Sequence, residues 1–168
     1  MRPDAAYWIQ HLNLSKHIEG GSFRQTYRSP LILERECLGN NFEGPRPVST
    51  SIYFLLEQGQ FSAFHKISSD ETWHFYEGDP LDIFEFDDNG QLITHKLGRD
   101  TQKGESFQVL VTAGRWFGSR IAGNGIYSLV GCTVAPGFDF ADFQLAVRAE
   151  LSALYPEHKT LIAEMTYK

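Results

Sequence analysis

Short apolar runs recur along the middle of the chain and predict its secondary structure. They are rich in β-branched and aromatic residues, which favour strands, and turn-forming residues separate them at short intervals. The runs lie at residues 23–29, 50–56, 61–67, 72–76, 81–86, 91–97, 107–112 and 126–134. This density of short strands predicts a sandwich or barrel. Between the fifth and sixth runs, Asp88-Asn89-Gly90 provides the residues of a tight hairpin turn, so these two strands are expected to pair antiparallel.

Both ends of the chain have the period of a helix. After the expected N-cap Asp4, apolar residues spaced by three and four form one face: Ala5, Trp8, Ile9 and Leu12. In the tail, Asp139 caps a second face made of Phe140, Phe143, Val147, Leu151 and Leu154. Pro156 separates this helix from a short one that carries Leu161, Ile162 and Met165. The sequence therefore predicts a mostly β protein with a short N-terminal helix and C-terminal helices.

The length and composition fit one well-packed domain. The chain has 168 residues, of which 42% are hydrophobic and 14% aromatic, enough for one large core and too few for two ordinary domains. We expect a single domain over residues 1–168, with a helix and first strand in 1–30, a barrel in 50–135 and a helical tail in 139–165.

The charge pattern argues against several classes of partner. The net charge is −6 and the basic residues are scattered, which disfavours nucleic acid. No stretch approaches the roughly 20 consecutive apolar residues of a membrane helix, and the start lacks the apolar run of a signal peptide. We therefore expect a cytoplasmic protein without a membrane partner. Cys37 and Cys132 have neither metal-binding nor disulfide spacing, so both are expected to be reduced thiols.

His65 is the most suggestive single residue. Alternate residues of a strand share a face, so His65 is expected to point into the interior with the other residues of its parity, Phe61, Ala63 and Ile67. Glu71 opens the next strand, with Trp73 and Phe75 on its own face, and is expected to lie beside His65. His65 and Glu71 would then be two polar side chains surrounded by the aromatic side chains of a pocket. Two interpretations stay open, a structural hydrogen bond and a catalytic dyad.

This stretch resembles the first motif of the cupins, a glycine followed by a His-x-His pair, a glutamate and a closing glycine. Gly59, His65, Glu71 and Gly78 fall in register, but Ile67 replaces the second histidine. Residues 112–117 are similar to the second cupin motif, with Phe117 at the position of a further histidine. The resemblance implies a jelly-roll barrel that lacks two of the usual four metal ligands.

We therefore predict no cofactor and no metal. Two protein donors hold a transition metal only weakly, since a tight site generally needs three or more. The alternative is a weak site formed by His65, Glu71 and His74. Strand parity places His74 on the face opposite to Glu71, so this site would need a bulge that re-aims it.

Four further segments make the resemblance more specific. They lie at residues 17–29, 50–56, 70–73 and 136–140, and they are similar to the "cupin five" branch, an uncharacterised part of the superfamily. The resemblance covers nearly the whole chain. It implies a jelly roll close in shape to the dTDP-sugar epimerases and a homodimer, and it implies no particular reaction.

The leading hypothesis is a cupin that binds a small, carbohydrate-like molecule and, if it is an enzyme, an isomerase or epimerase. His65 would remove a proton next to a carbonyl, Glu71 would orient His65, and Tyr53 or Tyr27 would return the proton. Other candidates for the pocket are Arg24, Ser51, Trp73, Phe75, Trp116 and Phe117, of which the four aromatic residues equally suit a core. The alternatives are a binding module without turnover, such as a sensor or carrier, and a metal-dependent oxygenase.

Overall fold

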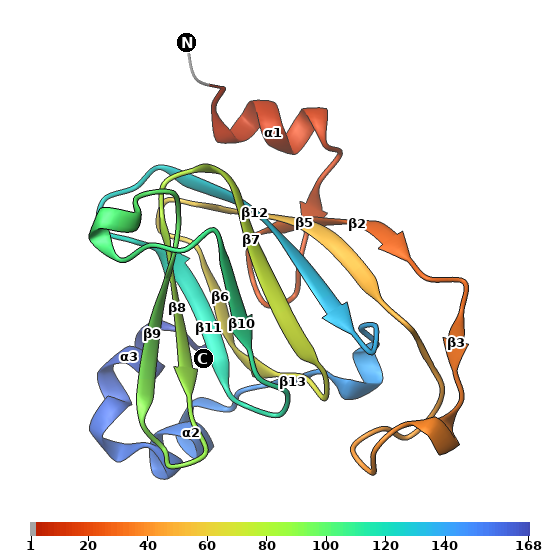
Figure 1. Cartoon of the computed structure of the whole chain (residues 1–168). Coiled ribbons are helices and arrows are strands. Elements are labelled where there is room, and N and C mark those ends of the chain that lie inside the picture. The colour runs from red at the N-terminus through yellow and green to blue at the C-terminus, as the bar shows by residue number, and fades with distance from the viewer. Residues whose placement is uncertain (1–2) are drawn as a thin grey trace.

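Two large antiparallel sheets face each other in the computed structural model, which describes residues 3–168 (Figure 1). Met1 and Arg2, where the expected domain begins, lie outside the described residues. The first sheet consists, in spatial order, of β1 (Ser15–Lys16), β2 (Ser22–Arg28), β5 (Thr50–Glu57), β12 (Tyr127–Ala135), β7 (Asp70–Gly78) and β10 (Gln108–Val111). The second consists of β13 (Gln144–Leu145), β6 (Phe61–Lys66), β11 (Phe117–Ile121), β8 (Leu81–Phe86) and β9 (Leu92–Leu97).

The strand pairing confirms the mostly β, jelly-roll architecture. Every strand pair in these two sheets is antiparallel. The expected hairpin is present, because β8 pairs with β9 and Gly90 occupies its turn with a φ of 78°. No strand ladder joins the two sheets within residues 3–168, so they form an open sandwich instead of the closed barrel that was expected.

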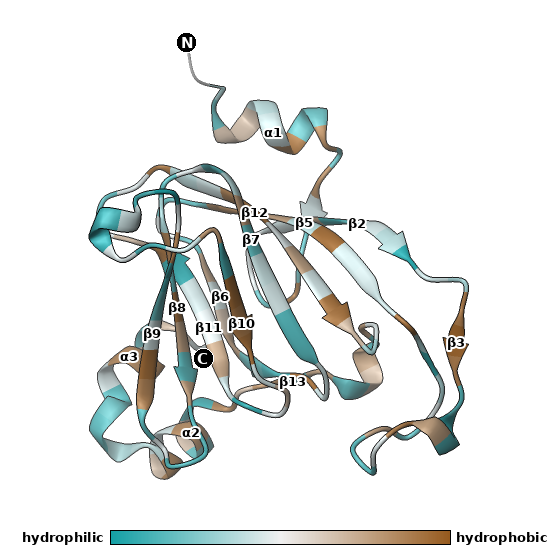
Figure 2. Cartoon of the chain, viewed as in Figure 1, coloured by the Kyte–Doolittle hydropathy of each residue, from teal (hydrophilic) through white to brown (hydrophobic). Residues whose placement is uncertain are grey.

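Large apolar side chains fill the space between the sheets. Hydrophobic segments alternate with more hydrophilic ones along the strands (Figure 2), as expected where one face of each strand is buried. The largest members of this core are Phe54, Trp73, Phe75 and Phe117, which come from both sheets. Complete burial of such a side chain contributes about 1.5–3 kcal/mol, so this core stabilises the packing of one sheet on the other.

Helices cover the outer faces of the sheets, as predicted. α1 (Ala5–His11) lies on the first sheet, and the N-cap Asp4 accepts a hydrogen bond of 2.8 Å from the Tyr7 N–H. α2 (Arg148–Leu154) and α3 (Lys159–Glu164) cover the second sheet over Phe64, Phe84 and Phe86. Single 3-10 turns complete the helical structure: η1 (Arg35–Cys37), η2 (Thr101–Lys103), η3 (Phe140–Asp142) and η4 (Pro156–His158). No helix of residues 3–168 combines the length and apolarity needed to cross a membrane.

The start of the tail differs from the prediction. Asp139 caps only the 3-10 turn η3, and the chain then pairs with β6 through β13 before α2 begins at Arg148. The apolar spacing that suggested a continuous helix has another cause: Phe143 packs against the core between the sheets, while Phe140 is 57% exposed. The expected helical face therefore exists only from Leu151 onward.

Residues 29–49 form an arm beyond the first sheet (Figure 1). Within it, β3 (Ile32–Leu33) pairs antiparallel with β4 (Arg46–Pro47). The buried Arg46 side chain ties the arm to η3, donating two hydrogen bonds of 2.6 Å to the Asp142 carboxylate. This ion pair fixes the segment that carries Phe138 and Phe140, beside the candidate site.

Candidate functional site

A β-bulge in β6 determines the direction in which His65 points. His65 pairs with Phe117 and Ser62 pairs with Ser119, so two residues of β6 oppose the single residue between them on β11. The extra residue shifts the alternation of faces. Ser62 and His65 consequently both turn toward Glu19, while Phe61 packs outward against the cluster beneath the C-terminal helices. The expectation that Phe61 shares the face of His65 is wrong for this reason.

The segment between β1 and β2 brings Glu19 to this bulge. The backbone C=O of Glu19 accepts a hydrogen bond of 2.7 Å from the Ala63 N–H, and the Ser62 hydroxyl donates one of 2.9 Å to Glu19 Oε1. The approach requires glycine at position 20: its φ is +114°, and a Cβ there would lie 2.0 Å from the Phe61 carbonyl oxygen. Gly20 therefore positions the carboxylate of Glu19.

His65 is buried, with both ring nitrogens in polar contacts. Its Nδ1 lies 2.7 Å from the Ala63 carbonyl oxygen, and because a carbonyl only accepts, Nδ1 carries a hydrogen. Its Nε2 lies 3.3 Å from Glu19 Oε2. The rings of Phe117 and Phe143 hold the imidazole, with centroids 4.2 and 5.2 Å away.

His17 is a second imidazole beside the same carboxylate, with the opposite pattern of hydrogens. Its Nδ1 lies 3.5 Å from Glu19 Oε2 and accepts a hydrogen bond of 3.3 Å from the Glu19 N–H; because this N–H points at the Nδ1 lone pair, the hydrogen of the neutral ring is on Nε2. Burial lowers the pKa of His17, and nearby His65 adds to this effect while Glu19 opposes it. His17 is therefore a neutral donor through Nε2.

Glu71 is a buried carboxyl that is held protonated. Burial, and after it the charge of Glu19, raises its pKa to about 8, against the lowering effect of a hydrogen bond with the Cys132 thiol. The expected pairing of Glu71 with His65 is wrong, because the carboxylate in contact with His65 is that of Glu19. The physical reason is topological: β6 and β7 belong to different sheets, so Glu71 faces His65 from across the sandwich and not from a neighbouring strand.

These groups line one cavity of about 100 Å³. The polar residues around it are His17, Glu19, Gln25, Thr50, His65, Glu71 and Cys132. The apolar residues are Phe23, Ile52, Ile67, Val134, Phe138 and Phe140. A dry cavity of roughly 150 Å³ suffices for benzene, so this one suits a molecule of a few heavy atoms. The arrangement combines a neutral acid, a carboxylate–imidazole pair and a neutral imidazole around a small volume.

Several candidates from the sequence lie outside this cavity. Ile52 lines it and Phe54 is in the core, so Ser51 and Tyr53 on the same strand point to the outer face of the first sheet. Arg24 also lies there, with its guanidinium 5.7 Å from the centre of the Tyr53 ring, and Tyr27 is 50% exposed. The expectation that Arg24, Ser51, Tyr53 and Tyr27 belong to the pocket is wrong, because strand parity turns the first three outward.

The aromatic candidates divide between the two sides of the second sheet. Trp73, Phe75 and Phe117 are part of the core between the sheets, and Phe117 also contacts His65. Trp116 packs instead with the cluster beneath the C-terminal helices, where Lys66 lies 4.8 Å from its ring centre. These four residues support the site or the core and do not line the cavity.

The residues present do not fit the cupin metal site. Ile67 and Phe117 put apolar side chains at two ligand positions. His74 lies on the outer face of the first sheet, where its ring nitrogens contact the Gln108 amide and the Thr133 hydroxyl at 3.0 Å each. Among residues 3–168, no three side chains of the types that bind metals are close enough together to hold an ion.

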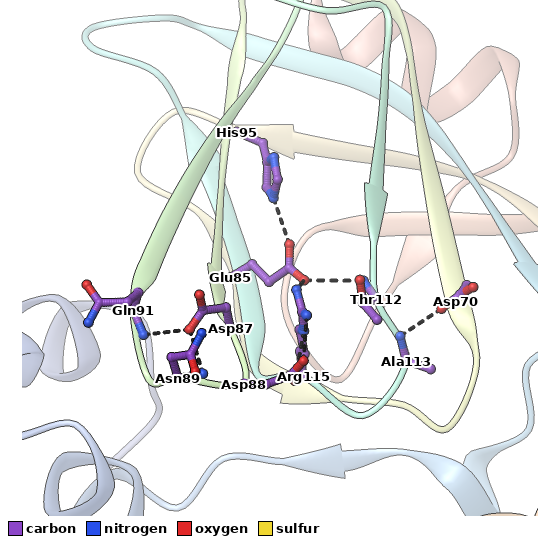
Figure 3. A network of polar contacts seen from close by, with 10 residues as sticks. All are labelled: Asp70, Glu85, Asp87, Asp88, Asn89, Gln91, His95, Thr112, Ala113 and Arg115. Atoms are coloured by element: carbon purple, nitrogen blue, oxygen red, sulfur yellow. Dashed lines mark hydrogen bonds and ion pairs between the residues drawn. The ribbon is translucent and has the colours of Figure 1, made fainter.

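A separate polar network lies at the turn of β8 and β9 (Figure 3). The carboxylate of Glu85 is buried, accepts hydrogen bonds of 3.0 Å from Arg115 and 3.3 Å from the Thr112 N–H, and contacts His95 Nε2 at 2.7 Å. Arg115 also binds Asp88 through two hydrogen bonds. None of these residues lines the cavity. Because Glu85 is fully satisfied, the network is structural and fastens the loop before β11 to the hairpin.

A family profile described as "Cupin superfamily (DUF985)" matches residues 6–146. The chain belongs to this cupin family. It is 34% identical over 143 residues to the uncharacterized protein YML079W of Saccharomyces cerevisiae, a match that covers 80% of this chain and 71% of the relative. The "cupin five" resemblance of the sequence is thereby confirmed.

Solved cupin structures agree with this assignment. Protein SO0799 from Shewanella oneidensis is 39% identical, covers 99% of each chain and has a TM-score of 0.89. A hypothetical protein from Leishmania major is 35% identical, covers 99% of this chain and all of its own (100%), with a TM-score of 0.88. A cupin 2 domain-containing protein from Halorhodospira halophila, 12% identical with a TM-score of 0.56 over 92% of this chain and 88% of its own, shows the cupin fold alone.

The sequence reasoning missed His17 and Glu19 as site residues. Both lie in the segment 17–29 that resembles this cupin family, next to Gly20 and Gly21. Both glycines have positive φ, and the close backbone approach that Gly20 allows brings Glu19 to His65. A His-x-Glu-Gly-Gly run before the first long strand was the available signal.

Proposed function

We propose that the cavity binds a small molecule and moves protons on it, as an isomerase or epimerase that uses no metal. One observation carries the proposal: the His65–Glu19 pair and Glu71, whose pKa is raised to about 8, line the same cavity. Titratable groups whose surroundings hold them in different protonation states are typical of general acid–base sites. The pair would serve as the base and Glu71 as the acid.

The proposed chemistry is an isomerisation through an enol. The pair takes a proton from a carbon next to a carbonyl, and the electrons of that C–H bond form a C=C bond. Glu71 gives its proton to the carbonyl oxygen. When the adjacent hydroxyl then returns a proton to Glu71 and the pair protonates the former carbonyl carbon, the isomer is released and both groups are restored.

This scheme revises the roles that the sequence suggested. Glu19 replaces Glu71 as the carboxylate that contacts His65, and Glu71 replaces Tyr53 or Tyr27 as the acid. His65 keeps its place as part of the base. The requirement for one acid and one base on a small ligand is unchanged.

A binding module without turnover is the second candidate. It is favoured by the contacts of both His65 ring nitrogens, with the Ala63 carbonyl and the Glu19 carboxylate. An imidazole fixed on both sides also suits a purely structural role. A metal-dependent oxygenase has no comparable support, because Ile67 and Phe117 occupy two ligand positions.

The experiment is a thermal-shift screen of small hydroxy-carbonyl compounds, sugars, organic acids and nucleotide sugars, since a ligand of the native state raises the Tm. We expect a compact ligand to stabilise the wild type and His11→Ala, in which an exposed histidine is lost, but not His65→Ala. A ligand that stabilises His65→Ala and wild type equally would place binding elsewhere. Conversion of the ligand, followed by NMR, separates enzyme from binding module.

A homodimer is part of this proposal. β1 pairs only with the start of β2, so in the described chain the stretch from Gln25 to Arg28 is paired on one side only. Such an edge favours pairing with another chain. A monomer in light scattering at micromolar concentration would contradict it.

A further inference from the structure

His17 offers the cavity a hydrogen-bond donor that no residue of 3–168 uses. Its Nδ1 is occupied by the Glu19 N–H, which leaves the hydrogen of the neutral ring on Nε2. The His17 side chain is only 9% exposed and lines the cavity. The ring is held by Phe23, whose centroid is 4.5 Å away in an edge-to-face arrangement. This N–H is therefore suited to an acceptor that arrives with a ligand.

Glu71 offers a second donor. As a protonated carboxyl it carries an O–H, and its neighbour Cys132 is itself a thiol that donates to it. Glu71 reaches the cavity from β7 in the first sheet, and His17 from the segment before β2. Two neutral donors from different elements therefore border the same small volume, which is the arrangement that binds a carbonyl oxygen and stabilises negative charge developing on it.

The charges around the cavity argue against an anionic ligand. Among the described residues that line it there is no lysine or arginine, and His65 is in contact with Glu19. At the nearby rim, Arg28 lies 4.0 Å from Asp139 and Arg46 is held by Asp142. A carboxylate or phosphate would thus meet the Glu19 charge without a free cation to balance it. A cationic amine would find the two carboxylate oxygens of Glu19 already in contact with Ser62 and His65, and the groups left to meet it, His17 Nε2–H and Glu71, are donors.

We propose that the ligand is an uncharged, compact carbonyl compound whose oxygen accepts hydrogen bonds from His17 Nε2–H and the Glu71 carboxyl. The inference rests on the proposed function and specifies its substrate class. The carbon skeleton of the ligand packs against the apolar wall formed by Phe23, Phe138 and Phe140. A cavity of about 100 Å³ holds only a few heavy atoms of a ligand, so a whole sugar nucleotide does not fit inside it.

The test uses sets of probes matched in size and different in charge. One set is dihydroxyacetone, glycerate and serinol, and another is cyclohexanone, cyclohexanecarboxylate and cyclohexylamine. Binding to the wild-type protein at pH 7 is measured by saturation-transfer NMR. We expect the ketone in at least one set to bind at least tenfold more tightly than its charged partners. His17→Phe, which keeps the ring and removes the donor, should weaken ketone binding about tenfold, whereas the matched control His11→Phe should not.

A pH series checks Glu71 independently of any folding defect in the His17 variant. The titratable groups that face Glu71 are Cys132 on β12, Glu19 and His17 before β2, and His65 on β6. In the wild type, ketone affinity should fall as the pH rises through about 8, where Glu71 loses its donor. In Glu71→Gln, whose amide remains a donor at all pH values, the affinity should stay constant from pH 7 to pH 9.5.

The outcomes separate this inference from the proposed function. Tighter binding of the carboxylate or the amine would overturn the ligand class and leave a small-molecule cavity in place. Equal ketone affinity in His17→Phe and wild type would overturn the role of His17. If no probe of any set binds the wild-type protein, both the ligand class and the proposed function are contradicted.

Discussion

Nε2 of His65 lies 3.3 Å from Oε2 of Glu19, although His65 is on β6 in the second sheet and Glu19 precedes β2 in the first. Two local features make the contact possible. The bulge in β6 turns His65 inward, and Gly20 lets the backbone next to Glu19 approach Phe61. The contact joins the two sheets at the cavity between them, and it creates the base of the proposed site.

The two cavity histidines should have opposite tautomers. His65 carries a hydrogen on Nδ1 and His17 on Nε2, as their backbone partners require. Long-range ¹H–¹⁵N spectra of imidazole-labelled protein measure this directly. Glu19→Gln should change the Nε2 shift of His65 while leaving its protonated Nδ1, because the Ala63 carbonyl partner remains. An unprotonated His65 Nδ1 would refute the assignment.

Glu71 should make the fold less stable at high pH. The unfolded carboxyl has a pKa of 4.5 and the folded one a pKa of about 8. Between these values the unfolded state binds fewer protons, so stability falls as the pH rises, by at most roughly 5 kcal/mol. Urea unfolding should therefore show Glu71→Gln gaining several kcal/mol relative to wild type from pH 5 to pH 9. Parallel pH profiles for the two proteins would show that Glu71 ionises normally.

Gly20 should tolerate substitution much less than Gly59. Both have positive φ, +114° and +81°, but a Cβ at Gly20 meets the Phe61 carbonyl at 2.0 Å and one at Gly59 meets nothing within 4 Å. Gly59→Ala should cost about 1–2 kcal/mol from backbone strain, and Gly20→Ala about 3 kcal/mol or more because the clash adds to it. Equal losses in urea unfolding would mean that the close approach is unimportant.

Arg115 should matter more for stability than Arg120. Replacing Arg115 by Met leaves the Glu85 carboxylate, whose side chain is 2% exposed, with only part of its compensation, at a cost of about 2–3 kcal/mol. Arg120 pairs with Glu164 at the surface, where the two side chains are 42% and 51% exposed, so Arg120→Met should cost at most about 1 kcal/mol. Chemical denaturation of both variants decides the comparison; a larger loss for Arg120→Met would contradict this account.

Much of the fold followed from local patterns in the sequence. The strands, the hairpin at Gly90, the N-terminal helix and the cupin resemblance all depend on short stretches whose residues interact with near neighbours. The tail was harder, because the spacing of Phe140 and Phe143 fits a helix as well as a 3-10 turn beside a pocket. Tertiary contacts of Phe143 with the core decided between the two.

Only part of the site could be predicted from the sequence. The sequence correctly predicted that His65 points into the interior, although the bulge at Ala63 changes the face on which Phe61 lies. The partner of His65 was missed because sequence neighbours were assumed to be neighbours in one sheet, whereas β6 and β7 lie in different sheets. Glu19 reaches His65 through a contact distant in sequence, which no local periodicity encodes.

Solvent-proton exchange tests the central claim, that this cavity moves protons on its ligand, most directly. The ligand found in the screen is incubated with protein in D₂O, and ¹H NMR follows the C–H next to its carbonyl. We predict deuterium incorporation at that carbon by wild type and His11→Ala, and at least a hundredfold slower incorporation by His65→Ala and Glu19→Gln, since positioned general acid–base groups contribute roughly 10²–10⁴-fold. A ligand that binds in the cavity but exchanges no faster than in buffer, or equally fast in all four proteins, would contradict it.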